Sequence, residues 1–253
     1  MTERLDQGAN QRRFPGAEVA FEKNHHPRPQ CRRQDLAQAL RGRLVGQGKN
    51  GGNIGTMHDP NSTLDEAALK EAIRQAGREL GFAAVGFARA DTTGAAAHLR
   101  DWLAAGCHGE MDYMARHAEL RADPQLLLAG TVTVISAAVD YLPHGKIAGN
   151  PEQAAISRYA QGRDYHKVVR HRLQRLAETI GALASPFGYR VFSDSAPVME
   201  VHFAQQAGLG WRGKHTLLLS QLGSWRFLGE IYCDIPLSPD APVEEHCGTC
   251  TAC

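Results

Sequence analysis

The sequence predicts an α+β fold of the mixed α/β kind, in which helices and strands are interleaved and some strands are neighbours along the chain. Two patterns carry this prediction: apolar residues that recur with the helical period, and short apolar runs rich in β-branched residues. The chain has 253 residues and a hydrophobic content of 43%. That is enough for one large core or two smaller ones. No internal repeat is visible.

The first patterned segments alternate between the two kinds of element. Apolar or small residues recur through 64–80 with charges between them, which predicts an amphipathic helix. A short buried strand is expected at 82–87, and helices are expected at 95–104 and 111–117. Residues 131–139 are rich in β-branched side chains and almost continuously apolar, so we predict a central strand there.

The longest predicted helix occupies 164–184. Asp164 stands at its start as an N-cap, its apolar positions form one face, and its outer face is basic. A strand is expected at 189–192, just before Asp194, and a helix is expected at 198–207. Asp194 therefore lies between the end of a strand and the start of a helix.

Two further strands are expected near the end of the patterned region. Residues 216–220 and 227–233 are apolar runs that flank the turn-forming sequence Gly-Ser-Trp at 223–225. We expect these two strands to pair with each other. Alternating helices and adjacent strand pairs together favour the α+β class over a purely parallel sheet.

The leading segment 1–56 differs from everything after it. It holds 10 Lys/Arg against 5 Asp/Glu and shows almost no periodic apolar pattern. Such a composition buries too little surface to offset chain entropy, so we expect disorder. Either this segment is a basic arm for nucleic acid, or Met57 is the natural start and the preceding residues are read-through; we favour the latter. Residues 57–253 then hold 18 Lys/Arg against 22 Asp/Glu.

Three of the six cysteines lie in the last seven residues, spaced C-x-x-C-x-x-C at Cys247, Cys250 and Cys253. This spacing is typical of iron–sulfur or zinc ligands and differs from a disulfide framework spread over a small domain. No apolar run reaches the length of a membrane span, and the N-terminus shows no hydrophobic signal segment. We therefore expect a protein of the reducing cytoplasm with no membrane partner.

Reactive side chains gather in three places after residue 150. Residues 156–166 combine arginines, two tyrosines and a histidine at the start of the longest helix, a set that suits a polyanionic or conjugated ligand. Residues 193–197 contain Asp194, which either caps a helix or acts as a proton donor at a pocket mouth. Residues 208–215 form a glycine-rich turn with Trp, Arg and Lys, and match neither a P-loop nor a dinucleotide fingerprint.

Several long motifs, in this order, resemble the epoxyqueuosine reductase family. They run from about residue 62 to the last residue, and they include GEMDYMARH at 109–117, SRYAQGRDYHKV at 157–168, DSAPVME at 194–200, GLGWRGKHTLLL at 208–219, GSWRFLGE at 223–230 and CGTCTAC at 247–253.

The resemblance implies the last step of queuosine synthesis, in which an epoxide on a modified tRNA base is reduced to an alkene with loss of water. It implies cobalamin in an N-terminal domain and two [4Fe–4S] clusters that supply electrons. The hard chemistry would belong to the cofactor. The implied partners are tRNA that bears epoxyqueuosine and an electron donor of unknown identity, and the protein is expected to act as a monomer.

The resemblance also implies roles for individual residues. Asp194 matches the family's proton donor, which is needed because an alkoxide is a poor leaving group at neutral pH. We predict that burial against the corrin keeps Asp194 protonated. The residues expected to line the cobalamin and substrate pocket are Arg121, Ser157, Arg158, Tyr165, His166, Gly213, Lys214 and Leu218. For His166 a plain capping role, and for Arg121 a plain surface role, stay as alternatives.

The resemblance predicts a cobalamin-binding catalytic domain at 57–240 and the start of a ferredoxin-like iron–sulfur domain at 241–253. Cys247, Cys250 and Cys253 match three ligands of one cluster, and the fourth ligand of such a run is missing. We therefore expect an incomplete chain that is weakly active or inactive. The net charge of −4 over 57–253 also predicts little affinity for tRNA through counterion release.

Two other interpretations stay open at the level of sequence. One is a different corrinoid iron–sulfur reductase, such as a reductive dehalogenase, which shares the pairing of cofactors. The other is a non-enzymatic fragment that binds cobalamin or a metal. The Asp-Ser-Ala-Pro motif at 194–197 favours the tRNA enzyme over the dehalogenase.

Overall fold

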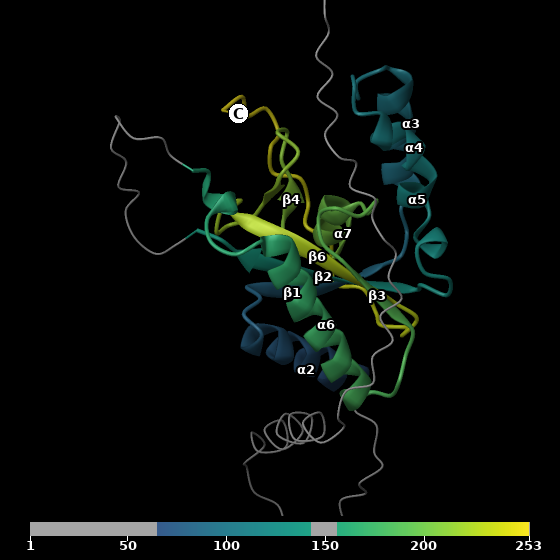
Figure 1. Ribbon diagram of the computed structural model, residues 1–253, viewed down its shortest axis with the longest axis vertical. Helices are drawn as coiled ribbons and strands as arrows, with labels where there is room; N and C mark the ends of the chain where they lie inside the picture. Colours follow the sequence, from purple (N-terminus) through teal and green to yellow (C-terminus); the bar gives the residue numbers. More distant parts are fainter. Residues whose placement is uncertain (1–64, 143–155, 253) are drawn as a thin grey trace, which may run out of the picture. The chain divides into compact units, whose positions relative to one another are not determined.

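A four-stranded antiparallel sheet organises the protein (Figure 1), and its strand order is β1-β2-β6-β3. The computed structural model describes residues 65–142 and 156–252. Strand β2 pairs with β1 on one side and with β6 on the other, and β6 pairs with β3. The strands are β1 (Ala84–Arg89), β2 (Thr133–Asp140), β3 (Tyr189–Phe192) and β6 (Arg226–Cys233).

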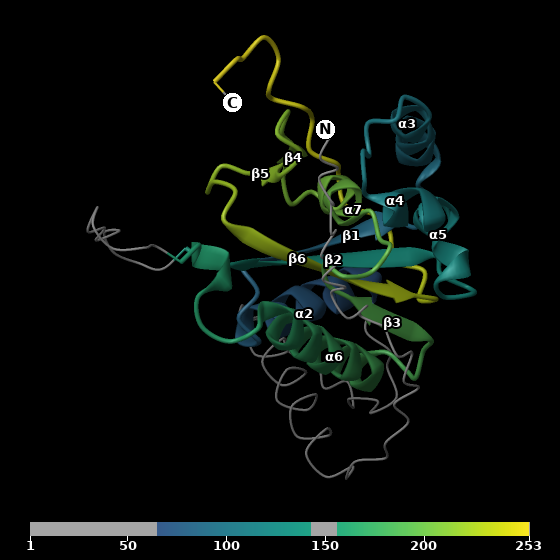
Figure 2. The same ribbon diagram turned by 45° about the horizontal axis from the view of Figure 1, so that its top comes forward.

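Helices cover both faces of this sheet. Figure 2 shows α2 (Glu66–Glu79) and α6 (Tyr165–Leu183) on one face and α7 (Glu200–Gln206) on the other. A third group joins the Arg89 end of β1, where the Thr92 hydroxyl donates to the Ala122 carbonyl. This group consists of α3 (Thr93–Ala104), α4 (Asp112–Arg116) and α5 (Ala118–Ala122), followed by the 3₁₀ turn η1 (Pro124–Leu126).

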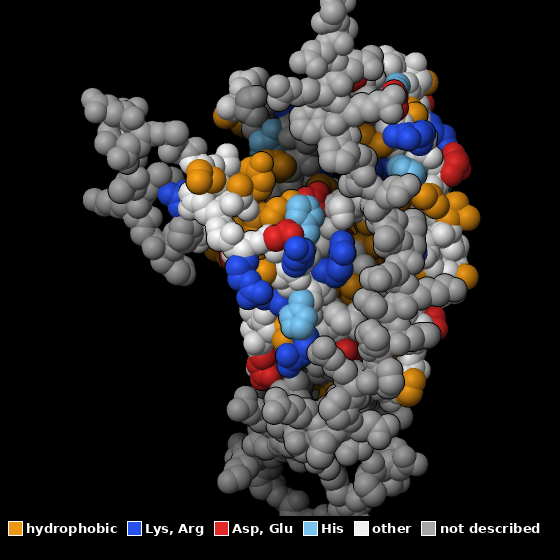
Figure 3. All heavy atoms as spheres, in the orientation of Figure 1, with side chains coloured by type: hydrophobic (Ala, Val, Ile, Leu, Met, Phe, Trp, Pro, Cys, Tyr) orange, Lys and Arg blue, Asp and Glu red, His pale blue; other side chains and the backbone are white. Residues whose placement is uncertain are grey.

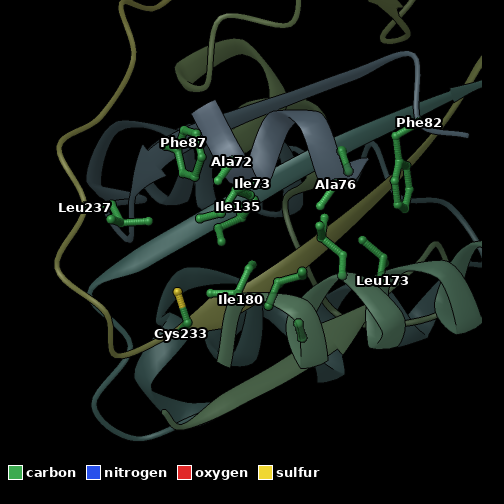
Figure 4. Close-up of a cluster of buried hydrophobic side chains, with 14 of the residues drawn as sticks. Ala72, Ile73, Ala76, Phe82, Phe87, Ile135, Leu173, Ile180, Cys233 and Leu237 are labelled. Atoms are coloured by element: carbon green, nitrogen blue, oxygen red, sulfur yellow. The ribbon is translucent and has the colours of Figure 1, made fainter. Parts of the chain in front are cut away.

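Each face of the sheet has its own apolar core. Between the sheet and α2 and α6, Ile73, Leu173 and Ile180 pack with Ile135 at zero exposure; Figure 4 shows this cluster. On the other face Phe203 of α7 packs against Val134 and Tyr232. Burial on both faces explains why β2 is almost continuously apolar, although its neighbours run antiparallel.

Most of the predicted elements are confirmed. The helix at 64–80 is α2, and Asp65 caps it by accepting from the Ala68 amide at 2.7 Å. The longest helix is α6, capped by Asp164 as expected. The predicted central strand is β2, with a neighbour on each side. The α+β class is therefore confirmed.

The predicted pairing of the last two strands is wrong. Residues 216–220 contain β5 (Leu218–Leu219), which pairs with β4 (Trp211–Arg212) in a separate two-stranded sheet. Strand β6 instead pairs with β2 along its whole length and with β3 at 230–233. Gly210 allows the alternative pairing, since a Cβ there would lie 2.1 Å from the Leu219 carbonyl oxygen.

Parts of the sequence interpretation lie outside the described residues. These are the extension at 1–56, the proposed start at Met57 and the last ligand, Cys253. The domain division at residue 240 stays a prediction. None of the helices within 65–142 and 156–252 has both the length and the apolar character needed to cross a bilayer.

Candidate functional site

Asp194 lies just beyond the end of β3, between the first turn of α6 and the start of α7. The hydroxyl of Tyr165 donates to Asp194 Oδ2. His166 Nε2 lies 3.1 Å from the same oxygen. The backbone of Asp194 has a φ of +58°, a left-handed conformation that Asp tolerates better than most residues. Two neighbours on one helix thus meet at a single carboxylate on another element.

The first turn of α6 holds these two side chains in place. Asp164 Oδ1 accepts from the His166 backbone amide at 3.1 Å and lies 3.0 Å from His166 Nδ1. One carboxylate therefore caps the helix and also orients the imidazole, so that Nε2 faces Asp194. The Tyr165 ring stacks on Phe227 of β6 with centroids 3.9 Å apart. The capping and functional interpretations of His166 are thus compatible.

The environment of Asp194 differs from that of Tyr165. The Asp194 side chain is 52% exposed, so the protein's own atoms do not bury it. Its predicted burial depends on a ligand that covers it, and stays a prediction. Burial raises the pKa of Tyr165 well above its usual value, and the hydrogen bond to Asp194 adds to this shift. Tyr165 therefore stays protonated and acts as a hydrogen-bond donor.

A pair of glutamates supports Asp194 from behind, with Glu230 fully buried and Glu200 partly buried. Glu200 Oε1 accepts from the Asp194 backbone amide at 2.5 Å. Burial raises the pKa of Glu200 to about 7, and the negative charge of Asp194 adds to the shift. Burial also raises the pKa of Glu230, which is fully buried and receives a hydrogen bond from the Ser136 hydroxyl at 3.5 Å. Two carboxyl groups in one apolar site cannot both ionise at low cost, so the charge of Glu200 raises the pKa of Glu230 further.

Sequence reasoning assigned no role to Glu200 or Glu230, although both stand at the ends of the motifs at 194–200 and 223–230. The available signal was an acidic residue inside an otherwise apolar run, as at Glu230 in β6. A buried ionisable residue is rare unless it is paired or functional. Only the sheet register, which places Glu230 opposite Phe192 and Ser136, brings this pair together below Asp194.

A pocket of about 300 Å³ opens beside Tyr165. Two predicted ligand-binding residues, Arg158 and Tyr165, line it. The pocket combines aromatic and basic side chains, so it offers stacking surfaces together with hydrogen-bond donors for anionic or amide oxygens. The other lining residues are Asp140, Tyr141, Leu142, Tyr159, Gln161, Arg163 and Phe227.

Two predicted residues lie apart from this group. Ser157 is exposed and precedes the 3₁₀ turn η2 (Arg158–Ala160). Arg121 lies on α5, near the N-terminal end of β2, whereas the pocket includes Asp140 at the other end of that strand. At the N-terminal end, the Gln125 side chain donates to the Thr131 carbonyl at 2.5 Å. Burial lowers the pKa of Arg121, and its guanidinium donates to the His117 carbonyl at 3.4 Å. Arg121 is therefore partly buried in its own helix group and does not contact Tyr165 or Asp194.

The β4–β5 hairpin carries the three other predicted ligand-binding residues. Gly213 allows two side chains of the hairpin to approach closely, because a Cβ there would lie 2.6 Å from the His215 ring and 2.9 Å from the Leu219 side chain. Lys214 donates to the Cys250 carbonyl at 2.7 Å. Leu218 is 4% exposed and belongs to the core on the α7 face. The hairpin thus connects this core to the cysteine segment.

Two of the three predicted metal ligands are described. Cys247 is partly buried and Cys250 is exposed, and both are free thiols. The Cys250 amide donates to the Cys247 carbonyl at 2.8 Å, which closes a tight turn at Gly248. Within the described ranges, no group of three or more His, Cys, Asp or Glu side chains is arranged to hold a metal ion. The C-x-x-C spacing suits two corners of a cluster, so the fit is partial.

Comparison with known proteins identifies the family. A family model described as epoxyqueuosine reductase QueG, DUF1730, matches residues 121–195. The epoxyqueuosine reductase of Burkholderia pseudomallei is 52% identical over an alignment of 225 residues, and the match covers 76% of this chain and 55% of that protein. The chain belongs to the epoxyqueuosine reductase family. It spans about half the length of the curated epoxyqueuosine reductases that it matches.

Solved structures of epoxyqueuosine reductases have the same fold. The structure of the Streptococcus thermophilus enzyme is 32% identical with a TM-score of 0.61, and the match covers 72% of this chain and 50% of that one. A second epoxyqueuosine reductase structure contains an epoxyqueuosine-modified tRNA-Tyr stem loop. It is 26% identical with a TM-score of 0.62, and the match covers 74% of this chain and 51% of that one.

Proposed function

We propose that this chain carries the catalytic part of an epoxyqueuosine reductase, which reduces the epoxide of a modified tRNA base to an alkene. The observation that supports this function best is the convergence of Tyr165 and His166 on Asp194, beside a pocket lined with aromatic and basic residues. Epoxide opening needs an acid at the departing oxygen, and this arrangement supplies one. The proposal includes a cytoplasmic location and a monomeric enzyme.

Asp194 acts as the proton donor in this proposal. Tyr165 and His166 both contact Oδ2, so the transferable proton stands on Oδ1. Tyr165 donates its own hydrogen bond and stabilises the carboxylate left after transfer, since charge-assisted hydrogen bonds are strong. His166, held through Nδ1 by Asp164, presents Nε2 to Oδ2 and can return a proton to Asp194. The backbone contact to Glu200 fixes the position of Asp194.

Cobalamin, when bound, supplies the reduced metal centre that opens the epoxide. The residues present fit such a ligand: Tyr159 offers an exposed aromatic face, and Arg158 and Arg163 offer donors for amide and phosphate groups. Trp211 Nε1 is buried and has no hydrogen-bond partner among the described residues, so it offers one more donor near the hairpin. We propose Arg158 and Tyr165 as the main protein contacts to this cofactor.

Electrons are proposed to arrive through an iron–sulfur cluster bound by Cys247, Cys250 and Cys253. The C-x-x-C-x-x-C spacing supports this assignment. The source of the electrons is a separate donor, which this proposal leaves unnamed. Lys214 supports the segment by its hydrogen bond to the Cys250 carbonyl.

The test compares Asp194→Asn with the unchanged protein after reconstitution with cobalamin, in the presence of a chemical reductant that supplies the two electrons of each turnover. Asn keeps the size of the side chain but cannot donate a carboxylic proton, so turnover of epoxyqueuosine RNA should fall at least about 100-fold. The visible absorbance of bound cobalamin should not change. Asp101→Asn on α3, which also removes an exposed carboxylate, is the matched control. Equal turnover in Asp194→Asn and the unchanged protein would remove Asp194 from the mechanism.

A further inference from the structure

The exposed face of α6 is densely basic. Its inward face is formed by buried apolar residues such as Val169, Leu173 and Leu176. The outward face carries the exposed side chains of Lys167, Arg170, His171 and Arg175. Figure 3 shows Lys and Arg side chains gathered with histidines over this helix. We name Lys167, Arg170 and Arg175 the basic ridge.

Among the residues that the structure describes, few acidic groups oppose this ridge. Asp164, one turn before it, lies 3.8 Å from Lys167 and also holds His166. Glu178, partly buried, is the acidic residue within α6 itself. Arg170 contacts the neutral Ser195 hydroxyl at 3.4 Å. The ridge therefore keeps a local positive charge, although residues 57–253 have a net charge of −4.

The ridge is continuous with the pocket. Arg158 and Arg163 line the pocket just before α6 begins. Arg170 contacts Ser195, the residue after Asp194. From Lys167 to Arg175 the helix rises about 12 Å, so the ridge can meet more than one phosphate group. A polyanion whose reactive base reached Asp194 would lie along α6.

We propose that the basic ridge of α6 binds the sugar-phosphate backbone of a stem-loop RNA whose modified base reaches Asp194. This inference rests on the proposed function, and it names the surface that binds the RNA substrate. Salt screens exposed charges over about 10 Å. The phosphate groups of an RNA that lies on α6 therefore interact with the ridge more strongly than with distant acidic residues. The expectation of little affinity from net charge alone therefore does not hold for this face.

The experiment neutralises the ridge and measures binding of a stem-loop RNA by fluorescence anisotropy. The ridge variant is Lys167→Gln, Arg170→Gln and Arg175→Gln. The matched control is Arg89→Gln, Arg100→Gln and Arg116→Gln, which removes the same charge from exposed positions on β1, α3 and α4. Circular dichroism melts verify that both variants fold, as expected for exposed positions.

The ridge variant should bind the RNA about 10-fold or more weakly near 0.1 M salt. The slope of log affinity against log salt should shrink by about 2 to 3, because each lost phosphate contact contributes roughly 0.7 to 0.9. The control variant should stay within about 2-fold of the unchanged protein, since its positions lie off the path of the RNA. An equal loss in both variants would show an effect of net charge and overturn the inference.

Two further outcomes separate the possible failures. If the unchanged protein binds and reduces the RNA but the ridge variant binds it equally well, only the ridge assignment fails. If the unchanged protein binds no RNA, the proposed function itself fails. Poly-glutamate serves as a competitor: displacement of RNA at equal charge concentration would point to an acidic protein partner and overturn the RNA assignment.

Discussion

Asp194 and the Cys247–Cys250 turn differ in how their reactive side chains are held. Asp194 receives contacts on its side chain from Tyr165 and His166 and on its backbone from Glu200. The cysteine turn is held through its backbone, by Lys214 at the Cys250 carbonyl. The first region fixes an acid before any ligand arrives. The second fixes a loop and leaves the thiols free to turn toward an ion.

This difference agrees with the two chemistries that we propose. A proton donor works only where neighbouring groups set its orientation and its charge, so distant parts of the chain must meet around it. Metal ligands obtain their orientation from the metal, and binding can be coupled to ordering of the loop. Tertiary packing is therefore required around Asp194, whereas close spacing along the chain is sufficient around Cys247.

The largest change in stability is expected at Leu218, where the hairpin beside the cysteine turn is attached to the core. Leu218→Ala removes a side chain that is 4% exposed and should lower the free energy of unfolding by about 2–4 kcal/mol. Urea unfolding measures this loss. Leu217→Ala, at a side chain 54% exposed, is the control and should change stability by less than about 0.5 kcal/mol. Equal effects at the two positions would mean that Leu218 faces a ligand rather than the core.

The next largest effect concerns the glutamates behind Asp194 and depends on pH. The folded pKa of Glu200, about 7, lies above the usual value of 4.5, so the folded state holds this proton more tightly than the unfolded chain. Its contribution to stability is complete below about pH 4.5 and is lost as the pH rises through 7. The free energy of unfolding should therefore fall between pH 5 and pH 8, by at most about 3 kcal/mol.

Glu200→Gln keeps an oxygen that accepts from the Asp194 amide but removes the titrating group. Urea unfolding of this variant at pH 5, 6.5 and 8 should show a smaller decline than the unchanged protein. Glu119→Gln on α5, an exposed site, is the control and should keep the full decline. If Glu200→Gln also kept the full decline, another group would be responsible for it.

The smallest effect is expected at the cysteine turn. Cys250→Ser replaces an exposed thiol whose residue contacts the protein through its backbone. The melting temperature without metal should therefore stay within about 1 °C of the unchanged protein, as is usual for exposed sites. Iron binding after anaerobic reconstitution should be weaker than in the unchanged protein. A clear drop in the melting temperature without metal would show that the thiol itself packs against the domain.

The elements were predicted well where one segment contains the whole signal. The apolar period of α6, its Asp164 cap and the β-branched run of β2 are local patterns, and the structure confirms each of them. The pairing of 216–220 with 227–233 was predicted wrongly for the converse reason. Strand partners depend on which distant segments meet in the fold, and β6 pairs with β2 along its whole length and with β3 at 230–233.

Among the predicted site residues, Tyr165, His166 and Asp194 meet, whereas Arg121, Gly213 and Leu218 serve other parts of the structure. Sequence similarity pointed to all six, because it reports that a residue belongs to a motif and not what it touches. Leu218 faces a core, and Gly213 permits a close approach within its own hairpin. Such distinctions depend on side-chain direction, which alternates along a strand and changes at each turn.

The sequence by itself determined the class of fold, the helix and strand segments, the position of Asp194 between a strand and a helix, and the cysteine spacing, since each of these depends on residues close together along the chain. Only the tertiary structure decided that Tyr165 and His166 share one carboxylate oxygen and that Glu200 and Glu230 form a pair behind it. It also decided that the basic side chains of α6 continue from the pocket. The physical reason is that burial, hydrogen bonding and local charge arise from groups brought together by folding, and no single segment contains them.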